Sequence, residues 1–447
     1  MPKGIRLLLL FFLLLTTLVA VDISAAELHV DVLEAKGTVN PVLADYIERG
    51  ISKAEEDGAV ACIIILDTPG GLLSSTEEIV SRISRAEVPV VVYVPRGGWA
   101  ASAGAFITLS ADVAAMAPGS AIGASTPIGG GGTELSEDER NKAVNFASAW
   151  IGSIAEEHGR NQAAAMAAVT EAASFKAGEA CGTADLSPQN QEILNVTRLD
   201  PPLIDDAGAE TVAELIYRLG EGISLANGKP FSIPQDVSSN DIKMTGMERF
   251  LLSITDPNIA YILMSIAILG ILIELSHPGL ILPGVVGGVC LLLSIYSLGI
   301  LEANYAGLLL MVLAFGLFIA EVFTTSFGLL FAGGVISLIM GSLILFSGTP
   351  FEVDAKVIAT VVILFTAIFA FVIFAIIRAH RRPITTGKEG MIGQVALART
   401  RLDPSGTVFV EGALWTATTE GDRIEPGEEV IVTKVEGLKL KVVKKTK

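Results

Sequence analysis

The chain has 447 residues, which is enough for two or three domains. Its formal net charge of −17 excludes a protein that binds nucleic acid through a basic surface. The mean hydropathy is +0.59, and the apolar excess lies in the first 20 residues and between Ile259 and Ile377. The composition therefore indicates globular parts attached to a membrane region.

The cysteines and histidines do not indicate a metal site. Cys62, Cys181 and Cys290 form neither a disulfide framework nor a CxxC pair, and they are interpreted as small buried hydrophobes. A bridge between Cys62 and Cys181 is compatible with a location outside the cytoplasm. The four histidines have no ligand spacing. We expect neither a metal nor a cofactor.

The N-terminus predicts export. Lys3 and Arg6 precede the apolar run Leu7–Leu15, and Ser24-Ala25-Ala26 has the small residues that a signal peptidase requires. Residues 1–26 are therefore predicted to be a secretory signal peptide. The alternative is an uncleaved anchor, although the apolar core is shorter than the ~20 residues of a membrane span. Both alternatives place the following segment outside the cytoplasm.

Residues 27–225 alternate between strand and helix patterns. A helix is predicted over Pro41–Glu56 with Asn40 as its cap, and Thr211–Leu219 is predicted to be the last helix. Alternating elements with buried strands predict an α/β domain with a mostly parallel sheet. The other predicted elements are strands at Leu28–Leu33, Ala59–Leu66, Val88–Val94 and Val113–Ala117, and helices at Ser74–Ala86 and Ala101–Ser110.

Two glycine-bearing turns follow neighbouring strands of this sheet, at the edge where a site is expected. In the turn Asp67–Leu72, Gly70 and Gly71 allow backbone N–H groups to point at a ligand. In the second turn, small residues surround Ser102 where a strand leads into a helix. A hydroxyl beside the free N–H groups of a helix start is a candidate nucleophile, provided that a base can reach it.

Lys142 is the better candidate for that base. His29 lies in the first strand, and His158 lies at a helix end among charged residues. Lys142 opens a helical stretch with no further charge before Glu156. A lysine on an apolar face is either a surface residue or a base that burial keeps neutral. The residues that share its helix face are Phe146, Ala149 and Trp150.

Residues Pro127–Asn141 are predicted to lack a regular element. They contain the glycine run Gly129–Gly132 and the acidic run Glu137–Glu139. Such a composition is typical of a solvated loop, and beside a site it is also typical of a mobile flap.

The combination of motifs resembles the NfeD-type membrane serine proteases of the Clp-protease/crotonase-like superfamily. The resemblance extends over nearly the whole chain. The residues that carry it are Asp67–Leu72, Ala100–Gly104, Met116–Ala124 and Lys142.

The resemblance implies a Ser–Lys dyad, with Ser102 as nucleophile and Lys142 as general base. It also implies an oxyanion hole formed by the N–H groups of Gly71 and Ala103. Substrate binding is expected at Gly70, Leu72 and Trp99; the bulk of Trp99 departs from the family pattern. Family members cut hydrophobic peptide segments, including those of stomatin- or prohibitin-like membrane proteins.

Residues 226–258 are predicted to be a linker with a short β piece, and residues 259–378 a membrane region. The second, fourth and fifth apolar runs have about the ~20 residues of a span, whereas the first and third are shorter and end near Glu274 and Glu321. These glutamates lie at interfaces, or one segment is re-entrant. A transporter is disfavoured because no intramembrane charge network is present. The runs are Ile259–Leu275, Leu280–Leu301, Tyr305–Ala320, Phe327–Phe346 and Val357–Ile377.

Five spans predict a multi-pass protein of the cytoplasmic membrane. The first domain then lies outside and the C-terminus lies in the cytoplasm. Arg378, Arg381 and Arg382 follow the last span, in agreement with the positive-inside rule. We expect contact with membrane lipid along the spans.

Residues 384–447 contain five short strand patterns, which predict a small OB-like barrel. We expect this barrel to bind a partner protein or another copy of the chain, in a homodimer or higher oligomer. The expected fold class is thus an α/β Clp/crotonase-like protease domain, an all-α multi-span region and a small all-β barrel. The expected function is a membrane-anchored Ser–Lys endopeptidase. The alternative is a non-proteolytic scaffold that organises stomatin-like partners.

Overall fold

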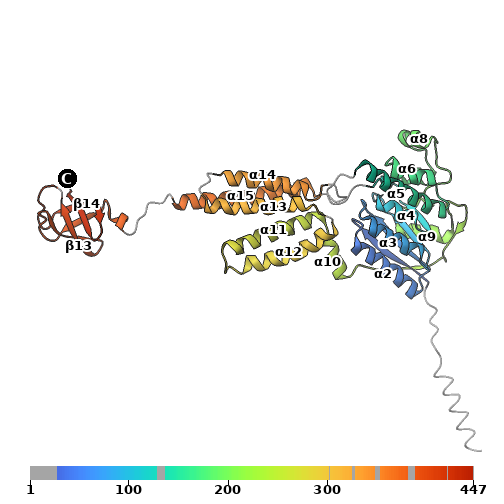
Figure 1. Cartoon of the computed structure of the whole chain (residues 1–447). Coiled ribbons are helices and arrows are strands. Elements are labelled where there is room, and N and C mark those ends of the chain that lie inside the picture. Colours follow the sequence, from blue (N-terminus) through green and yellow to red (C-terminus); the bar gives the residue numbers. More distant parts are fainter. Residues whose placement is uncertain are drawn as a thin grey trace, which may run out of the picture. The chain divides into compact units, whose positions relative to one another are not determined.

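The structure is a computed structural model. It describes residues 28–127, 136–301, 303–324, 328–347, 353–380, 388–419 and 421–445. The predicted signal peptide, the glycine run Gly129–Gly132, and Arg381 and Arg382 lie outside the described residues. The chain divides after Thr366 into two compact units, and each is described by itself (Figure 1).

A five-stranded parallel sheet forms the centre of the N-terminal domain, in the order β10-β1-β2-β3-β5. The predicted parallel sheet is therefore confirmed. The edge strand β10 lies in the predicted linker and is its expected β piece. The strands are β1 (His29–Lys36), β2 (Ala61–Asp67), β3 (Val90–Val94), β5 (Val113–Met116) and β10 (Ser238–Asp241).

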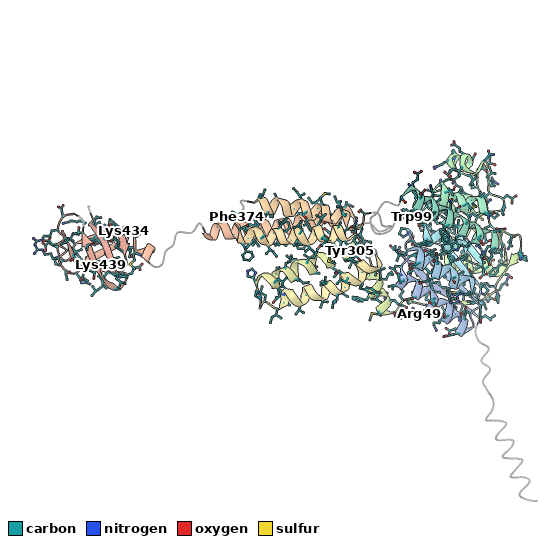
Figure 2. The ribbon with its side chains drawn as sticks, viewed as in Figure 1. Arg49, Trp99, Tyr305, Phe374, Lys434 and Lys439 are labelled. Carbon is teal, nitrogen blue, oxygen red and sulfur yellow. The ribbon has the colours of Figure 1, made fainter. Side chains whose placement is uncertain are left out.

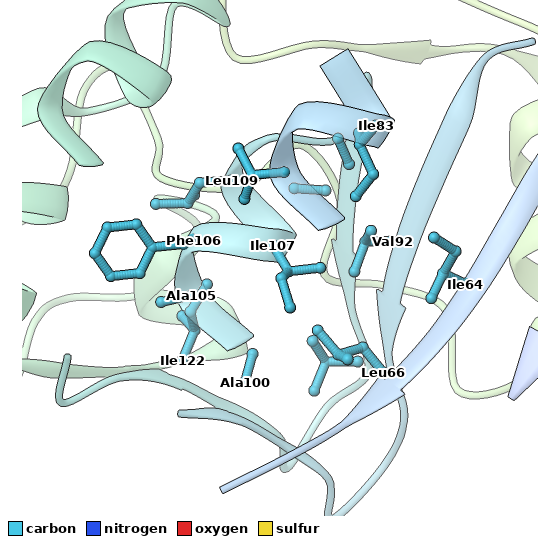
Figure 3. Packing of buried hydrophobic residues seen from close by; sticks show 14 of the residues in the cluster. Ile64, Leu66, Ile83, Val92, Ala100, Ala105, Phe106, Ile107, Leu109 and Ile122 are labelled. Atoms are coloured by element: carbon cyan, nitrogen blue, oxygen red, sulfur yellow. The ribbon is translucent and has the colours of Figure 1, made fainter. Parts of the chain in front are cut away.

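Helices cover both faces of this sheet because its strands are apolar on both sides. Ile64 and Val92 belong to the larger core, beneath Ile83 and Ile107 of the helices (Figure 3). The intervening residues, such as Ile63, pack on the opposite face in a second cluster with the last helix of the domain. The helices are α2 (Pro41–Asp57), α3 (Leu73–Ser84), α4 (Ala103–Leu109), α5 (Glu137–Glu157), α6 (Gln162–Thr170) and α9 (Val212–Glu221).

A small sheet, in the order β4-β6-β7, lies where the chain leaves β3. Its strand β4 (Trp99–Ala101) pairs with β6 (Ala121–Gly123), and α4 consequently begins two residues later than predicted. Ser102 thereby occupies the single position between β4 and α4. The remaining short elements are β7 (Ser174–Lys176), α7 (Ala177–Ala180), α8 (Pro188–Leu194), β8 (Ile223–Ser224) and β9 (Pro230–Phe231).

The predicted loop Pro127–Asn141 is wrong for its last five residues, because α5 begins at Glu137. Ser136 Oγ accepts the N–H of Glu139, and the Glu139 carboxylate accepts the N–H of Ser136. This reciprocal capping box satisfies backbone donors at the helix start. The acidic run also interacts favourably with the positive end of the helix dipole, so it starts a helix.

Five apolar helices follow α10 (Gly246–Ile254), as predicted. Among the described residues, four are long and apolar enough to span a membrane. The fourth apolar run, Phe327–Phe346, is predicted to be long enough for a span, but its helix α14 has only 16 residues. The expectation that the first and third runs would be short was wrong, since both helices continue past their glutamates. The helices are α11 (Pro257–Ser276), α12 (Leu282–Ile300), α13 (Tyr305–Phe323), α14 (Leu329–Ile344) and α15 (Ala355–His380).

These glutamates bond to backbone at the turn of a helical hairpin. Glu274 of α11 accepts the N–H of Gly279, just before α12. Glu321 of α13 accepts the N–H groups of Gly328 and Phe331 at the start of α14. Both oxygens of Glu321 are thus hydrogen-bonded, and such a carboxylate is tolerated within an apolar helix pair. Oε2 of Glu274 is buried without a partner among the described residues.

The second unit contains a closed barrel in the strand order β11-β12-β13-β15-β14. Val408, Val430 and Leu440 fill its interior. The predicted sequence of an α/β domain, an all-α region and a five-stranded barrel is therefore confirmed. The elements are η1 (Lys388–Met391), β11 (Val395–Ala398), β12 (Ser405–Val410), β13 (Ala413–Thr419), β14 (Glu429–Glu436) and β15 (Lys439–Lys444).

Candidate active site

Ser102 occupies a strained turn between β4 and α4. Its φ of 52° and ψ of −114° are rare for a residue with a side chain. Such a conformation costs about 1–3 kcal/mol and persists only where neighbours enforce it. Here the N–H of Ser102 donates to the carbonyl of Gly123 at 3.0 Å, and its carbonyl accepts Ser125 Oγ at 3.2 Å. The turn thus fixes the direction of the Ser102 side chain.

The Gly70–Gly71 turn lies directly against Ser102. A Cβ atom on Gly70 would stand 2.7 Å from the Cβ of Ser102 and 3.1 Å from its Oγ, and Gly70 has a φ of +122°. The turn is held by Val39, whose N–H donates to the carbonyl of Gly70 at 2.8 Å and whose carbonyl accepts the N–H of Leu72 at 2.9 Å. Only glycine fits this position, both sterically and conformationally.

The N–H groups of Gly71 and Ala103 have no acceptor among the described residues. Ala103 is the first residue of α4, and the first N–H groups of a helix have no partner within the helix. Gly71 pairs with Val39 in a parallel bridge, whose hydrogen bonds use the carbonyl of Gly70 and the N–H of Leu72. Within the described ranges, both predicted oxyanion donors thus lack a competing protein acceptor.

Lys142 lies on α5, which packs against α4 through aromatic rings. Phe106, one turn after Ser102, contacts Trp150 with a centroid distance of 4.7 Å. Phe146, one turn after Lys142, contacts the same ring at 6.5 Å. The Lys142 side chain is exposed, and so are its neighbours Phe146 and Ala149. The predicted apolar face of this half of α5 is thus not covered by the described residues.

The histidine alternatives receive no support from the fold. His29 begins β1, whereas the Gly70–Gly71 turn follows the end of the parallel strand β2. His29 therefore lies at the opposite edge of the sheet. His158 caps the C-terminal end of α5, and its Nδ1 lies 3.0 Å from the carbonyl of Ile154. Lys142 lies near the other end of that helix.

Large apolar side chains are exposed at the two turns and on α5. Trp99, whose side chain is labelled in Figure 2, is 60% exposed, and its backbone N–H donates to Asp67 Oδ1 at 3.1 Å. Leu73, at the start of α3, is 48% exposed, and Phe146 is 56% exposed. Leu72 is half-buried beside Leu73. The sequence analysis missed Leu73, although an apolar residue just after the glycine turn was the available signal.

The cysteines are unsuited to nucleophilic chemistry. Cys62 and Cys181 are free, so the bridge between them is not formed. Burial raises the pKa of Cys62 to about 12 and that of Cys181 to about 11. Both thiols are therefore protonated at neutral pH. Within the described ranges, no group of three His, Cys, Asp or Glu side chains could hold a metal ion.

Three family models match the chain in succession. A model of the NfeD1b N-terminal domain matches residues 29–197, and one of the NfeD integral membrane domain matches residues 258–376. A model of the NfeD-like C-terminal, partner-binding domain matches residues 388–444. The chain belongs to the NfeD family.

Two characterised relatives extend over almost the entire chain. The membrane-bound protease PH1510 of Pyrococcus horikoshii is 35% identical over 438 residues, which is 93% of each chain. The membrane protein NfeD1b of Bacillus subtilis is 29% identical over 465 residues, which is 98% of each chain. A solved structure of the 1510-N membrane protease specific for a stomatin homolog, from P. horikoshii, covers 52% of this chain and 100% of its own. It is 30% identical, with a TM-score of 0.39.

Proposed function

We propose that the chain is a membrane-anchored serine endopeptidase that works through a Ser102–Lys142 dyad. The observation that carries the proposal is the strained Ser102 turn packed against Gly70, together with two backbone N–H groups that have no acceptor in the part of the chain that the structure describes. Such a constellation suits acyl transfer, in which a nucleophile and oxyanion donors must lie at one point. The chain is 35% identical to a membrane-bound protease in an alignment that covers 93% of the chain, which supports the same activity.

In the proposed reaction, neutral Lys142 takes the proton of Ser102 as its Oγ attacks a peptide carbonyl. The N–H groups of Gly71 and Ala103 stabilise the oxyanion of the tetrahedral intermediate. The protonated lysine then donates to the leaving amine, and an acyl-enzyme forms on Ser102. Water hydrolyses this ester when Lys142 acts again as base and then as acid.

The exposure of Lys142 calls for a covering group, and we assign this role to the substrate. An apolar peptide segment lying over Leu73, Trp99 and Phe146 would also exclude water from Lys142. Exclusion of water disfavours the ammonium form and so generates the base only when substrate is bound. Gly70 and Leu72 would line the same path. This chemistry favours hydrophobic segments of membrane proteins as substrates.

The proposed substrates and partners are stomatin- or prohibitin-like membrane proteins. The family resemblance suggests them, and the C-terminal barrel matches a partner-binding domain. We place the multi-pass chain in the cytoplasmic membrane in contact with lipid. The peptidase domain lies outside, the barrel lies in the cytoplasm, and the chain assembles as a homodimer or higher oligomer. We propose an OB-type barrel and a cleaved signal peptide for the two ends.

The test is cleavage of peptides from a stomatin-like partner by the purified full chain. Ser102→Ala and Lys142→Ala should each abolish cleavage while unfolding at the wild-type denaturant concentration. Arg140→Ala is the matched control, because Arg140 is an exposed cation on the same stretch of α5. It should retain activity. Substantial turnover by Lys142→Ala would refute the dyad.

A non-proteolytic scaffold is the second candidate, and the match to a partner-binding domain favours it. An active-site serine probe separates the two functions. A protease should be labelled at Ser102, and Ser102→Ala should prevent the labelling. A scaffold should remain unlabelled and still capture a stomatin-like partner through its barrel.

A further inference from the structure

One buried hydrogen bond joins the end of α10 to the start of α2. Asn40 Nδ2 donates to Thr255 Oγ1 at 3.0 Å, and each residue is only 2% exposed. The other end of the same amide, Asn40 Oδ1, accepts the N–H of Leu43 at 3.0 Å and caps α2. Thr255 Oγ1 itself donates to the carbonyl of Leu252 at 2.9 Å. Neither buried polar group can lose its partner without a cost.

On one side, Asn40 directly follows Val39, the residue that bonds to the Gly70–Gly71 turn. Val39 forms the main-chain hydrogen bonds to Gly70 and Leu72, whereas Thr68 at the start of the turn bonds to β4. A Cβ atom on Gly71 would lie 2.0 Å from the carbonyl oxygen of Val39, so the two backbones are in direct contact. A displacement of Asn40 therefore acts, through Val39, on the part of the turn that faces Ser102.

On the other side, the bond lies at the start of the apolar helices. Asp256 follows Thr255, and its carboxylate accepts the N–H groups of Asn258 and Ile259 at the start of α11. Ser297 of α12 donates to the carbonyl of Ile254 at 2.7 Å. Two apolar helices are thus attached to the residues on either side of Thr255.

A second attachment joins α10 to α2. Arg49 of α2 donates through Nε and Nη2 to the two carboxylate oxygens of Glu248 on α10, at 2.7 and 2.8 Å. Tyr46 Oη also donates to the carbonyl of Ile242 at 2.7 Å. A bidentate pair fixes orientation as well as distance. Between these helices, the Asn40–Thr255 bond is the attachment that lies beside the turn.

We propose that Asn40 and Thr255 are positioning residues, which set the Gly70–Gly71 turn against Ser102 from the start of the first apolar helix. The effect on turnover rests on the proposed peptidase function, whereas the effect on the order of the turn does not. Through this attachment, the geometry of the turn depends on the positions of α10 and α11 relative to α2. The membrane region thereby contributes to the active site without touching the substrate.

The test uses the full chain in detergent and the variant Thr255→Val, which keeps the side-chain shape and removes the hydroxyl. Amide hydrogen exchange should become faster in residues 68–72. We expect kcat to fall about tenfold with little change in KM, less than the ~10²–10³-fold loss on removing an oxyanion donor. Thr255→Ser, which restores the hydroxyl, should restore both the exchange rate and kcat.

Asn40→Ser provides an independent variant with a matched control. Serine keeps the cap of α2 but lacks the amide donor. Asn161 caps α6 in the same way, accepting the N–H of Ala164 at 2.9 Å, and its Nδ2 donates to the carbonyl of Pro201 at 2.9 Å. Asn161→Ser should therefore leave kcat and exchange of residues 68–72 unchanged, whereas Asn40→Ser should alter both.

Unchanged exchange of residues 68–72 in Thr255→Val would overturn the proposal, whatever the activity. Faster exchange with an unchanged kcat would also overturn it, because the turn would then be loosened without consequence. Failure of the peptidase function itself has a different signature. In that case Ser102→Ala would match the wild type in every cleavage assay, and the exchange result would still decide whether the bond orders the turn.

Discussion

Replacement of Gly70 by alanine should separate the reactivity of Ser102 from the stability of the fold. The new Cβ would stand 2.7 Å from the Cβ of Ser102, whereas contacting carbon atoms lie about 3.5–4.0 Å apart. One of the two turns must therefore move by about 1 Å, and a displacement of that size can cost ~10²-fold in rate. Alanine at a φ of +122° adds backbone strain of about 1–3 kcal/mol.

The assay combines denaturant unfolding with the rate at which an active-site serine probe labels Ser102. Gly58→Ala is the control, because Gly58 has a φ of +71° at the end of α2 and no atom within 4 Å of its ideal Cβ position. Both variants should unfold at lower denaturant concentration than the wild type. Only Gly70→Ala should be labelled about 10²-fold more slowly.

Labelling of Gly70→Ala at the wild-type rate would refute this reasoning. It would mean that the turn and Ser102 can separate without affecting the hydroxyl. Equal slowing in Gly58→Ala would refute it as well, since the effect would then follow from lost stability.

Three further predictions concern the surroundings of the site. Phe106→Ala should lower the free energy of unfolding by about 3–5 kcal/mol, since its ring is buried against α5; calorimetry at neutral pH checks this. Cys62, whose pKa burial raises to about 12, should resist alkylation at pH 8 until the protein is denatured; rapid labelling of the native chain, seen by mass spectrometry, would contradict the prediction. The hydrogen bond from Arg49 lowers the pKa of Glu248. Glu248→Gln should therefore be less stable than the wild type at pH 7. The difference in free energy of unfolding should vanish as the pH falls below about 4, because the carboxylate is then protonated first in the unfolded and next in the folded protein. Unfolding curves across this pH range test the prediction.

Much of the fold is encoded in local patterns. Asn40 followed by Pro41 predicts the start of α2, and the β-branched runs predict the parallel strands that the structure contains. The five strands of the barrel follow from alternation between turn residues. The placement of Ser102 at a strand-to-helix turn follows from small residues after a buried strand. Each of these signals lies within a few residues of the element that it predicts.

Two of the wrong predictions, the loop over the start of α5 and the short first and third apolar runs, have different physical causes. At α5, a local signal was present in Ser136 and Glu139 and was outweighed by the neighbouring glycines. At the ends of α11 and α13, a glutamate suggested an interface, because sequence does not reveal a backbone donor that lies beyond the next turn.

Contacts between distant segments gave no signal at all. Val39, which follows β1, donates to the carbonyl of Gly70, which follows β2. Gly123 of β6 accepts the N–H of Ser102. Thr255 is 215 residues from Asn40. The residues that shape the candidate site are thus found in the fold, whereas the residues proposed to react were found in the sequence.

The two glutamates of the apolar helices, one in each helical hairpin, have a consequence for how the chain inserts into a bilayer. Glu274 is the only acidic residue between Pro257 and Ile300, and Glu321 is the only one between Tyr305 and Ile344. Each acid accepts a backbone N–H from the turn that leads into the next helix, Glu274 from Gly279 and Glu321 from Gly328. A nascent chain that delivers two helices at a time therefore brings every acid together with its own donor. Insertion of one pair need not wait for synthesis of the next.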